Sequence, residues 1–458
     1  MNTPPLSGGT AGPAALRPLL STVLDALHDG AAARGGPLPA GGPDRTAARV
    51  RAAAHPVLPG TGTGAEEALR TLVTTIAEGA ADPADPLCAA HLHCPPLALA
   101  TAADLAASAL NPSMDSWDQA PAASALEALV TTALAAEVYP GHPAADALLT
   151  TGGTESNQVA LLLARERHGP VQIVCGANAH HSLHRAAWLL GLPAPVEVPA
   201  PSGEMDPAAL DTALTGLRPP LLVVATAGTT DTGQIDPIPE IADLCETHGA
   251  ELHIDAAYGG PLLFSPAHRT KLTGIERAHS VTLDLHKLGW QPAAAGLIAV
   301  ADPTRLHALN HTADYLNADD DTEAGLPDLL GRSLRTTRRP DVLKIAVTLR
   351  ALGRDGLAHL VDRTCALAAE LAALLHAHPA FELYAHPTIS TVLFRPTTAD
   401  DDTLAALRRT LLTEGRAVLG RARTADGRLW LKATLLNPHA TTGDLHALLE
   451  LLEGSTPR

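Results

Sequence analysis

Aromatic side chains are scarce in this chain, since phenylalanine, tryptophan and tyrosine together make up only 2% of 458 residues. Cysteine is also rare. Five cysteines, an odd number without paired spacing, fit a reducing compartment better than a disulfide scaffold. No apolar run approaches the length of a membrane span, and the N-terminus lacks a basic region followed by an apolar stretch. We therefore expect a cytoplasmic protein with no membrane partner.

Positive charge is the next deficit. The chain has 32 lysines and arginines against 49 aspartates and glutamates, and its net charge of −17 argues against a nucleic-acid partner. Hydrophobic residues make up 46% of the chain and charged residues only 18%, which predicts a well-folded globular protein. A chain of 458 residues is too long for one ordinary core, so we expect two or three packed units.

The central part of the chain alternates strand-like and helical patterns. Strand-like runs lie at 171–174, 221–225, 251–255, 281–285 and 296–300. Helical patterns lie between several of them, at 156–167, 183–190 and 239–248. Apolar strands that alternate with helices predict an α/β fold, with a mostly parallel central sheet covered on both faces.

The two ends of the chain differ from this centre. The N-terminal part is rich in Ala, Gly and Pro, with one helical stretch around residues 19–27, and residues 31–37 and 56–64 are predicted to be loops or linkers. Beyond about Pro340, Ala/Leu-rich helices accompany a strand at 392–395, which predicts a small α+β unit. The expected division is an N-terminal helical and linker segment at 1–84, a large domain at 85–340 and a small C-terminal domain at 341–458.

Two strand ends carry a carboxylate and an amine. Asp255 ends the run 251–255, and His286 and Lys287 follow the run 281–285. An enzyme that uses pyridoxal 5'-phosphate (PLP) needs this pair, because the lysine condenses with the cofactor aldehyde and the carboxylate keeps the pyridine nitrogen protonated. The alternative is a buried aspartate and a lysine that extends to the surface.

A glycine-rich turn precedes one of the helical patterns. Residues 150–157 read Thr-Thr-Gly-Gly-Thr-Glu-Ser-Asn. Glycines let the backbone approach an anion closely, and the N–H groups of the first helical turn then bind it. The alternative is an ordinary turn with a threonine helix cap.

Three histidines follow another strand, namely His180, His181 and His184. They have no cysteine or carboxylate partner at ligand spacing, so we expect no metal site there.

Two segments together resemble a known family. Residues 253–260 (His-Ile-Asp-Ala-Ala-Tyr-Gly-Gly) and 284–290 (Asp-Leu-His-Lys-Leu-Gly-Trp) are similar to the signatures of the group II PLP-dependent amino acid decarboxylases. That family includes glutamate, aromatic amino acid and 2,4-diaminobutyrate decarboxylases. The resemblance runs from about Asp85 to the C-terminus. It implies the PLP-dependent transferase fold of type I and a homodimer whose N-terminal segment wraps the partner.

The resemblance also implies roles for individual residues. It covers the turn at 152–157, the segment 179–186, where Arg185 stands in place of the family's lysine, and the turn at 225–230. His180 is expected to stack on the cofactor ring. The expected cofactor contacts are Gly153, Thr154, Ser156, His180, Thr230, Asp255, Ala257, His286 and Lys287.

Tyr315 corresponds to a tyrosine that the family carries on a mobile loop and that returns a proton to Cα after carbon dioxide leaves. The polar, acidic stretch 318–325 that follows it suits such a lid. The alternative is a core or interface tyrosine. The expected catalytic residues are therefore Lys287, Tyr315, His180 and Asp255.

Two segments near residue 100 are expected to shape the substrate pocket. They contain His91, Cys94, Asp115, Trp117 and Asp118, and they are closest to the diaminobutyrate decarboxylases and related lysine or ornithine enzymes. If Asp115 and Asp118 face the pocket, they suit a substrate with a distal ammonium, because a cation in a closed site needs a paired carboxylate. The alternative is a set of loop carboxylates or helix caps.

The function that follows is decarboxylation of an L-amino acid to carbon dioxide and a primary amine, with a diamino acid as the expected substrate. Alternatives are another substrate (glutamate, aspartate or an aromatic amino acid) and decarboxylation coupled to oxidative deamination, against which Tyr315 argues. A third hypothesis is a scaffold protein that has the PLP-enzyme fold but no catalytic activity. The joint presence of Lys287, Asp255 and His180 argues against it.

Overall fold

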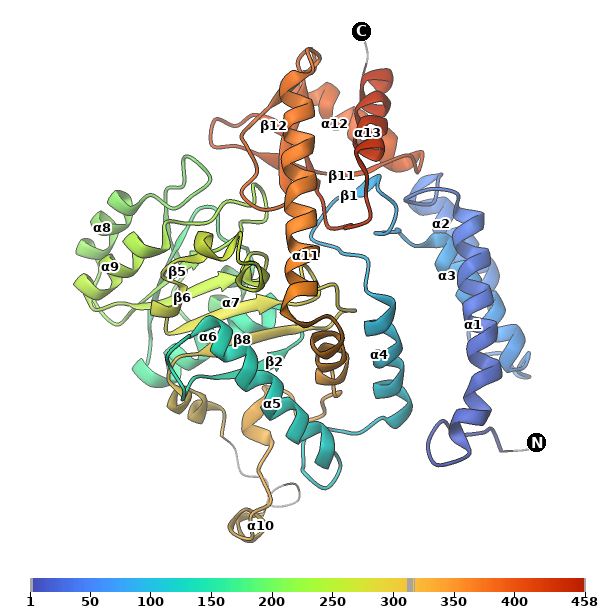
Figure 1. Ribbon diagram of the computed structural model, residues 1–458, viewed down its shortest axis with the longest axis horizontal. Coiled ribbons are helices and arrows are strands. Elements are labelled where there is room, and N and C mark those ends of the chain that lie inside the picture. Colours follow the sequence, from blue (N-terminus) through green and yellow to red (C-terminus); the bar gives the residue numbers. More distant parts are fainter. Residues whose placement is uncertain (1–2, 311–315, 317, 457–458) are drawn as a thin grey trace.

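The computed structural model describes residues 3–310, 316 and 318–456, and a seven-stranded sheet forms its centre (Figure 1). The strands are β2 (Asp146–Thr150), β3 (Gln172–Gly176), β4 (Val196–Val198), β5 (Leu221–Thr226), β6 (Glu251–Ala256), β7 (Ser280–Asp284) and β8 (Gly296–Val300). Their order is β2-β8-β7-β6-β5-β3-β4. The strands β4, β3, β5, β6 and β7 run parallel, while β8 is antiparallel to both its neighbours, so the predicted mostly parallel sheet is confirmed.

Helices cover both faces of this sheet because its strands are apolar on both sides. The helices are α5 (Pro121–Val138), α6 (Gly153–His168), α7 (Ser182–Leu189), α8 (Pro207–Gly216) and α9 (Ile238–His248). In β5, Leu222 and Val224 share a core with α6 and α7, whereas Val223 and Ala225 face the core that α8 and α9 join. Strand β2 was not among the predicted runs.

The C-terminal part forms a second, five-stranded sheet. Its strands are β1 (Cys88–Ala89), β9 (Phe381–Leu383), β10 (Thr391–Pro396), β11 (Val418–Arg423) and β12 (Leu429–Thr434), in the order β1-β11-β12-β10-β9. The helices α11 (Val342–Ala377, interrupted at Gly353), α12 (Asp401–Thr413) and α13 (Thr442–Ser455) accompany it. Leu371, Phe394 and Leu448 belong to its separate core.

Strand β1 joins this small sheet although it lies early in the chain. Cys88 and Ala89 pair in parallel with Val418 and Leu419 of β11. The chain therefore touches the small unit before helix α4 (Ala98–Leu110) and the large sheet begin. The domain boundaries at 84 and 340 stay predictions.

The N-terminal segment is more helical than predicted. It forms α1 (Gly12–Arg34), α2 (Gly42–Ala54) and α3 (Ala65–Gly79), so the loop predicted at 31–37 is wrong for residues 31–34, the last turn of α1. Alanine favours this turn, and Gly35 then ends the helix in a left-handed conformation (φ 70°). Gly30 lets α1 and α3 pack closely, because a Cβ there would lie 2.6 Å from that of Ala77.

Helix α5 is long and apolar enough, by length and composition alone, to cross a membrane. The expectation that no stretch approaches that length therefore fails for α5. One such helix is weak evidence for a membrane span, because helices in a protein core meet the same criteria of length and composition. Glu127 of α5 forms a buried ion pair with Arg338 (2.9 Å), and Leu134 belongs to the large core.

Candidate active site

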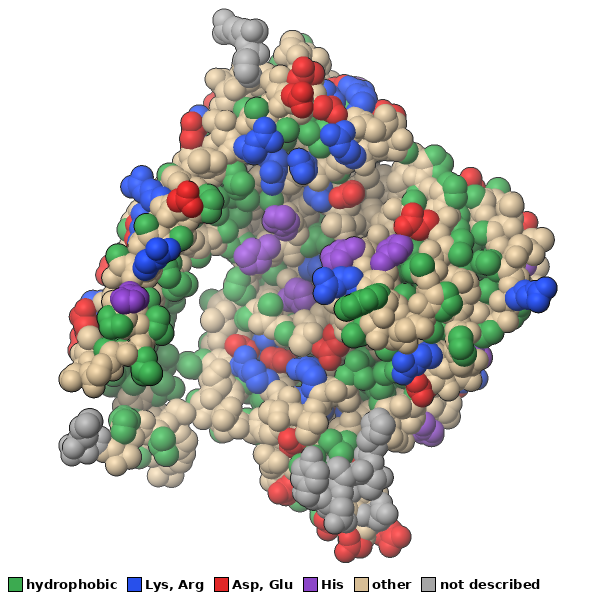
Figure 2. All heavy atoms as spheres, turned by 180° about the vertical axis from the view of Figure 1, so that it is seen from behind, with side chains coloured by type: hydrophobic (Ala, Val, Ile, Leu, Met, Phe, Trp, Pro, Cys, Tyr) green, Lys and Arg blue, Asp and Glu red, His purple; other side chains and the backbone are tan. Residues whose placement is uncertain are grey.

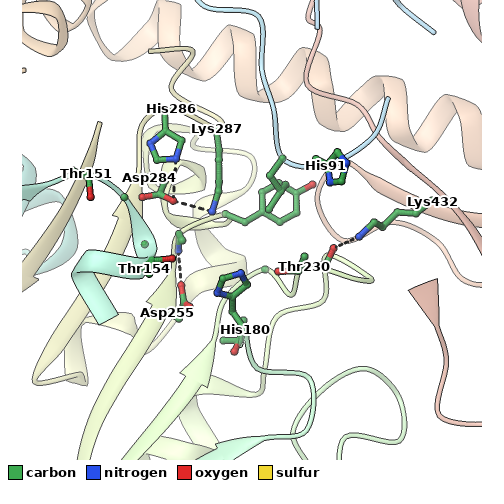
Figure 3. A pocket seen from close by; sticks show the side chains of 17 residues that line it. His91, Thr151, Thr154, His180, Thr230, Asp255, Asp284, His286, Lys287 and Lys432 are labelled. Atoms are coloured by element: carbon green, nitrogen blue, oxygen red, sulfur yellow. Dashed lines mark hydrogen bonds and ion pairs between the residues drawn. The ribbon is translucent and has the colours of Figure 1, made fainter. Parts of the chain in front are cut away.

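A cavity of about 400 Å³ opens where strands β5, β6 and β7 end and helix α6 begins. Such strand ends are where open α/β sheets bind ligands. Figure 2 shows histidine side chains grouped near the middle of the rear face, and Figure 3 shows the cavity from close by. The lining residues from the large unit include Thr151, Gly152, Gly153, Thr154, His180, Thr230, Asp255, Ala257, Asp284, His286 and Lys287, and His91 and Lys432 complete the opposite wall.

The predicted amine and carboxylate both line this cavity. Lys287 follows β7, and its Nζ lies 2.9 Å from Oδ2 of Asp284. Asp255, near the end of β6, is buried and accepts a hydrogen bond from Nδ2 of Asn157 (2.7 Å) and one from the backbone N–H of Ala257 (3.1 Å). Both donors treat Asp255 as an acceptor, and an aspartate in this place can hold a protonated ring nitrogen.

The glycine-rich turn forms a cradle at the start of α6. A Cβ at Gly152 would lie 2.8 Å from Cε1 of His286, and a Cβ at Gly153 would lie 2.9 Å from Cβ of Ala257. Only glycine leaves this space open. Because the first turn of α6 also exposes backbone N–H groups there, the residues present fit the phosphate of PLP.

His180 points into the cavity between Asp255 and Thr230 (Figure 3). Burial lowers the pKa of its imidazole, and the carboxylate of Asp255 opposes that shift only partly. The ring is therefore neutral near pH 7. Its Nδ1 lies 2.9 Å from Oγ of Ser182, so the edge of the ring that carries Nε2 faces the cavity.

His286 closes the cavity beside the lysine. Burial lowers its pKa as well, and its Nε2 lies 3.5 Å from Oδ2 of Asp284. Its Nδ1 accepts a long hydrogen bond (3.4 Å) from the backbone N–H of Ala295. Both contacts hold the ring beside the glycine cradle, so His286 lines the cavity together with the other residues predicted to contact the cofactor.

Ser156 does not line the cavity, although it was predicted to hold the cofactor. Its side chain is fully buried, and its Oγ lies 2.7 Å from Oγ1 of Thr150 at the end of β2. The reason is its place inside the first turn of α6, from which the side chain points back to the sheet. Tyr315, the predicted proton donor, lies outside the described residues.

Only one of the five predicted substrate contacts lines the cavity. His91 does so, and burial lowers the pKa of its ring. Cys94 lies behind the wall, where its Sγ donates to the backbone carbonyl of His286 (3.2 Å). Burial raises the pKa of this thiol to about 12, so it is a packed, unreactive side chain.

The other three predicted contacts lie elsewhere in the chain. Asp115 accepts from Nε2 of Gln119 (3.0 Å), Asp118 accepts from Oγ of Ser116 (2.5 Å), and Trp117 borders a separate hollow beside α5. The two carboxylates thus stabilise the loop before α5, which matches the alternative of loop carboxylates. Sequence spacing could not show this, because the loop folds against Arg338 rather than toward the sheet edge.

Two functional residues escaped the sequence interpretation. Lys432 lies on β12, and its side chain is only 7% exposed yet reaches the cavity wall. Its Nζ donates to the carbonyl of Thr230 (2.8 Å) and lies 3.3 Å from Oδ1 of Asp231. A lone lysine inside an apolar strand was the available signal. Asn157 lay within the motif at 150–157 but was given no role.

This combination of a type I fold, a lysine and a carboxylate at neighbouring strand ends, and an anion cradle defines a PLP-dependent enzyme. Comparison with known proteins gives the family. The pyridoxal-dependent decarboxylase conserved domain matches residues 62–397, and the chain belongs to this family. It is thus a PLP-dependent amino acid decarboxylase, a carboxy-lyase.

Relatives and solved structures agree with this assignment. The chain is 41% identical to L-2,4-diaminobutyrate decarboxylase of Rhizobium meliloti, over 88% of this chain and 84% of that protein. It is 33% identical to the Acinetobacter baumannii protein of the same name, over 85% and 83%. The glutamate decarboxylase domain of a Vibrio parahaemolyticus diaminobutyrate protein superposes with a TM-score of 0.87, at 34% identity over 98% and 97% of the two chains. Mouse CSAD superposes with a TM-score of 0.87 at 26% identity, over 97% and 99%, and the predicted type I fold is confirmed.

The chemistry divides between the cofactor and this chain. When bound, PLP withdraws electrons from the bond that breaks at Cα. Lys287 would supply the amine that attaches the cofactor, and Asp255 would hold the proton on the ring nitrogen. Gly152 and Gly153 leave room for the phosphate. His180, which lines the same cavity, would contact the cofactor ring without adding positive charge to it.

Proposed function

We propose that this decarboxylase acts on an L-diamino acid, with L-2,4-diaminobutyrate as the first candidate. The observation that carries the proposal is the ion pair between Lys432 and Asp231 at the wall between the cavity and a neighbouring hollow. The nearly buried ammonium of Lys432 can hold one substrate carboxylate. The exposed carboxylate of Asp231, which lines the neighbouring hollow, can hold a distal ammonium.

This arrangement suits a substrate with one carboxylate and a second amine. A second carboxylate, as in glutamate or aspartate, would meet the like charge of Asp231. The names of the two relatives above point to the same substrate. Asp231 thereby takes the role that the sequence interpretation gave to Asp115 and Asp118.

A substrate screen tests the proposal. Carbon dioxide release is measured for L-2,4-diaminobutyrate, L-ornithine, L-lysine, L-glutamate, L-aspartate and the aromatic amino acids. Oxygen uptake is followed in the same samples, so that oxidative deamination is detected too. We expect kcat/KM to be highest for a diamino acid. A preference for glutamate or aspartate would contradict the proposal.

Substitution of Asp231 sharpens this test. We expect Asp231→Asn to raise KM for diaminobutyrate about 3-fold, since an ion pair at an exposed carboxylate contributes roughly 0.2–1 kcal/mol. L-2-aminobutyrate, which lacks only the distal amine, should be affected much less. Equal effects on both amino acids would show that Asp231 merely supports Lys432. Asp243→Asn, at an exposed carboxylate on α9, is the matched control.

We further propose a cytoplasmic homodimer. Helices α1 and α3 pack on each other and stand apart from the body along most of their length (Figures 1 and 2). Their apolar side chains Leu24 and Ile76 are 65% and 60% exposed, which is costly unless a partner covers them. The five cysteines are free, which suits a reducing compartment.

Solution mass tests the dimer. We expect sedimentation equilibrium to give twice the chain mass of 47.2 kDa. The double variant Leu24→Glu/Ile76→Glu should dissociate, while Leu129→Glu, at an exposed leucine of α5, should not. A fully active monomer at assay concentration would contradict the proposal.

A further inference from the structure

Asn157 ties together three elements beneath the active-site cavity. It lies in the first turns of α6 with no exposed surface, and its side chain contacts groups on β6, β7 and α7. Nδ2 lies 2.7 Å from Oδ2 of Asp255 and 2.9 Å from Oγ of Ser182. Oδ1 lies 3.0 Å from Oγ1 of Thr282 and 3.1 Å from Nε2 of His253. All four hydrogen-bonding positions of the amide are therefore used.

The partners determine which way this amide faces. An ionised carboxylate only accepts hydrogen bonds, so the nitrogen of Asn157 must face Asp255. One N–H then points to Asp255 and the second to Oγ of Ser182. The oxygen faces Thr282, whose hydroxyl donates to it. The amide thus donates to Asp255 and to Oγ of Ser182 at the same time.

Ser182 carries this orientation to His180. Its Oγ accepts from Asn157, and its single hydrogen is free to donate to Nδ1 of His180, 2.9 Å away. The backbone N–H of Ser182 also points at this Nδ1, at 3.3 Å. Two donors aimed at one ring nitrogen require that this nitrogen carry no proton. In a neutral imidazole the proton must then lie on Nε2.

We propose that Asn157 and Ser182 are positioning residues that hold His180 in its Nε2–H tautomer, so that the ring presents an N–H donor to the cavity. His180 then donates a hydrogen bond to an anionic oxygen bound there, such as a substrate carboxylate, and does not remove a proton from the substrate at Nε2. Because the same amide holds Asp255, the ring-nitrogen carboxylate and the histidine above the ring are oriented by one residue. The inference does not depend on which amino acid is the substrate.

Histidine ring NMR tests the tautomer directly. The full-length protein is labelled with ¹⁵N-histidine and measured at pH 7.5, with and without PLP, and the His180 signals are assigned from their loss in His180→Gln. We expect wild-type His180 to show a protonated Nε2 and an unprotonated Nδ1, which resonates far downfield. Observation of Nδ1–H in the wild-type protein would overturn the proposal.

Variants of Ser182 separate positioning from general packing. Ser182→Ala removes the hydroxyl donor, and we expect His180 to populate both tautomers and kcat to fall about 10-fold. Ser182→Thr retains a hydroxyl and should restore the Nε2–H form and kcat to within about 3-fold. Ser124→Ala removes another buried hydroxyl, which donates only to a backbone carbonyl in α5, and should leave the His180 signals unchanged.

Asn157 has its own expected signature. In Asn157→Ala, Oγ of Ser182 no longer accepts a hydrogen bond from Asn157, and its hydroxyl can rotate. The NMR signals of His180 should therefore broaden or shift as in Ser182→Ala. The far-UV circular dichroism spectrum and the thermal midpoint show whether each variant is folded. An unchanged Nε2–H tautomer in a folded Ser182→Ala protein would refute the relay.

Discussion

The amine of Lys287 and the carboxylate of Asp284 form an ion pair at 2.9 Å, with side chains that are 18% and 2% exposed. The two residues are three positions apart at the end of β7. The other carboxylate oxygen, Oδ1 of Asp284, is buried and has no hydrogen-bond partner among the described residues. Lys287 therefore balances a nearly buried charge in addition to the role of cofactor amine that is predicted for it.

Lys287→Ala should separate these two roles. We expect loss of multiple turnover and loss of covalent cofactor attachment, together with a fall in stability of about 3 kcal/mol because a buried carboxylate is left unpaired. The double variant Lys287→Ala/Asp284→Asn should regain most of that stability but no activity. Urea unfolding measures the stability, and borohydride trapping with peptide mapping locates the attached lysine. Trapping on another lysine would refute the assignment.

Asp255→Ala should depress decarboxylation by about 100-fold or more, because the ring nitrogen loses the group that keeps it protonated. Lys287 should still bind the cofactor covalently. Steady-state kinetics and cofactor absorbance measure the two effects. Near-normal turnover in this variant would contradict the role of Asp255. Asp211→Ala, at an exposed carboxylate of α8, is the control.

His253 should make the folded protein sensitive to acid. Burial lowers the pKa of its ring to about 4, against the opposing charge of Asp255. As the pH falls below about 6.5, His253 becomes protonated in the unfolded chain but stays neutral in the folded protein. The free energy of unfolding therefore decreases by about 3 kcal/mol between that pH and pH 4. Urea unfolding between pH 7.5 and 5 should show this slope.

The variant His253→Gln should flatten that slope, because the titrating group is gone. His376→Gln, at an exposed histidine of α11, should leave it unchanged. Equal slopes in all three proteins would show that other groups, such as the half-buried His180 and His286, control the acid response.

Tyr315→Phe tests the one catalytic assignment that lies outside the described residues. A phenol can return a proton to Cα, and phenylalanine cannot. We expect slower amine formation, with part of the product appearing as aldehyde and ammonia while oxygen is consumed. An oxygen electrode and amine quantification measure this. Amine formation at the wild-type rate without oxygen uptake would show that another group donates the proton.

The sequence by itself determined five of the seven strands of the large sheet and placed Asp255 and Lys287 at two strand ends. The apolar strands 221–225 and 251–255 were predicted within one residue of β5 and β6, because strands buried on both faces read as continuous apolar runs. Asp255 and Lys287 were found because residues that follow neighbouring parallel strands meet at one sheet edge. The glycines of the cradle could also be recognised from the sequence, because a glycine-rich turn before a helix is a local pattern and no other residue leaves space there.

Tertiary structure alone decided the rest of the site. Lys432 lies 202 residues from the carbonyl of Thr230 that it contacts, and Asn157 lies 98 residues from Asp255. Neither the periodicity of the sequence nor the spacing of its motifs can predict contacts between residues so far apart. Asp115 and Asp118 have suitable chemistry in a suitable segment, yet their loop turns away from the cavity. The direction in which a loop carboxylate points depends on the packing of the whole chain, whereas the end of a buried strand is determined by its own residues.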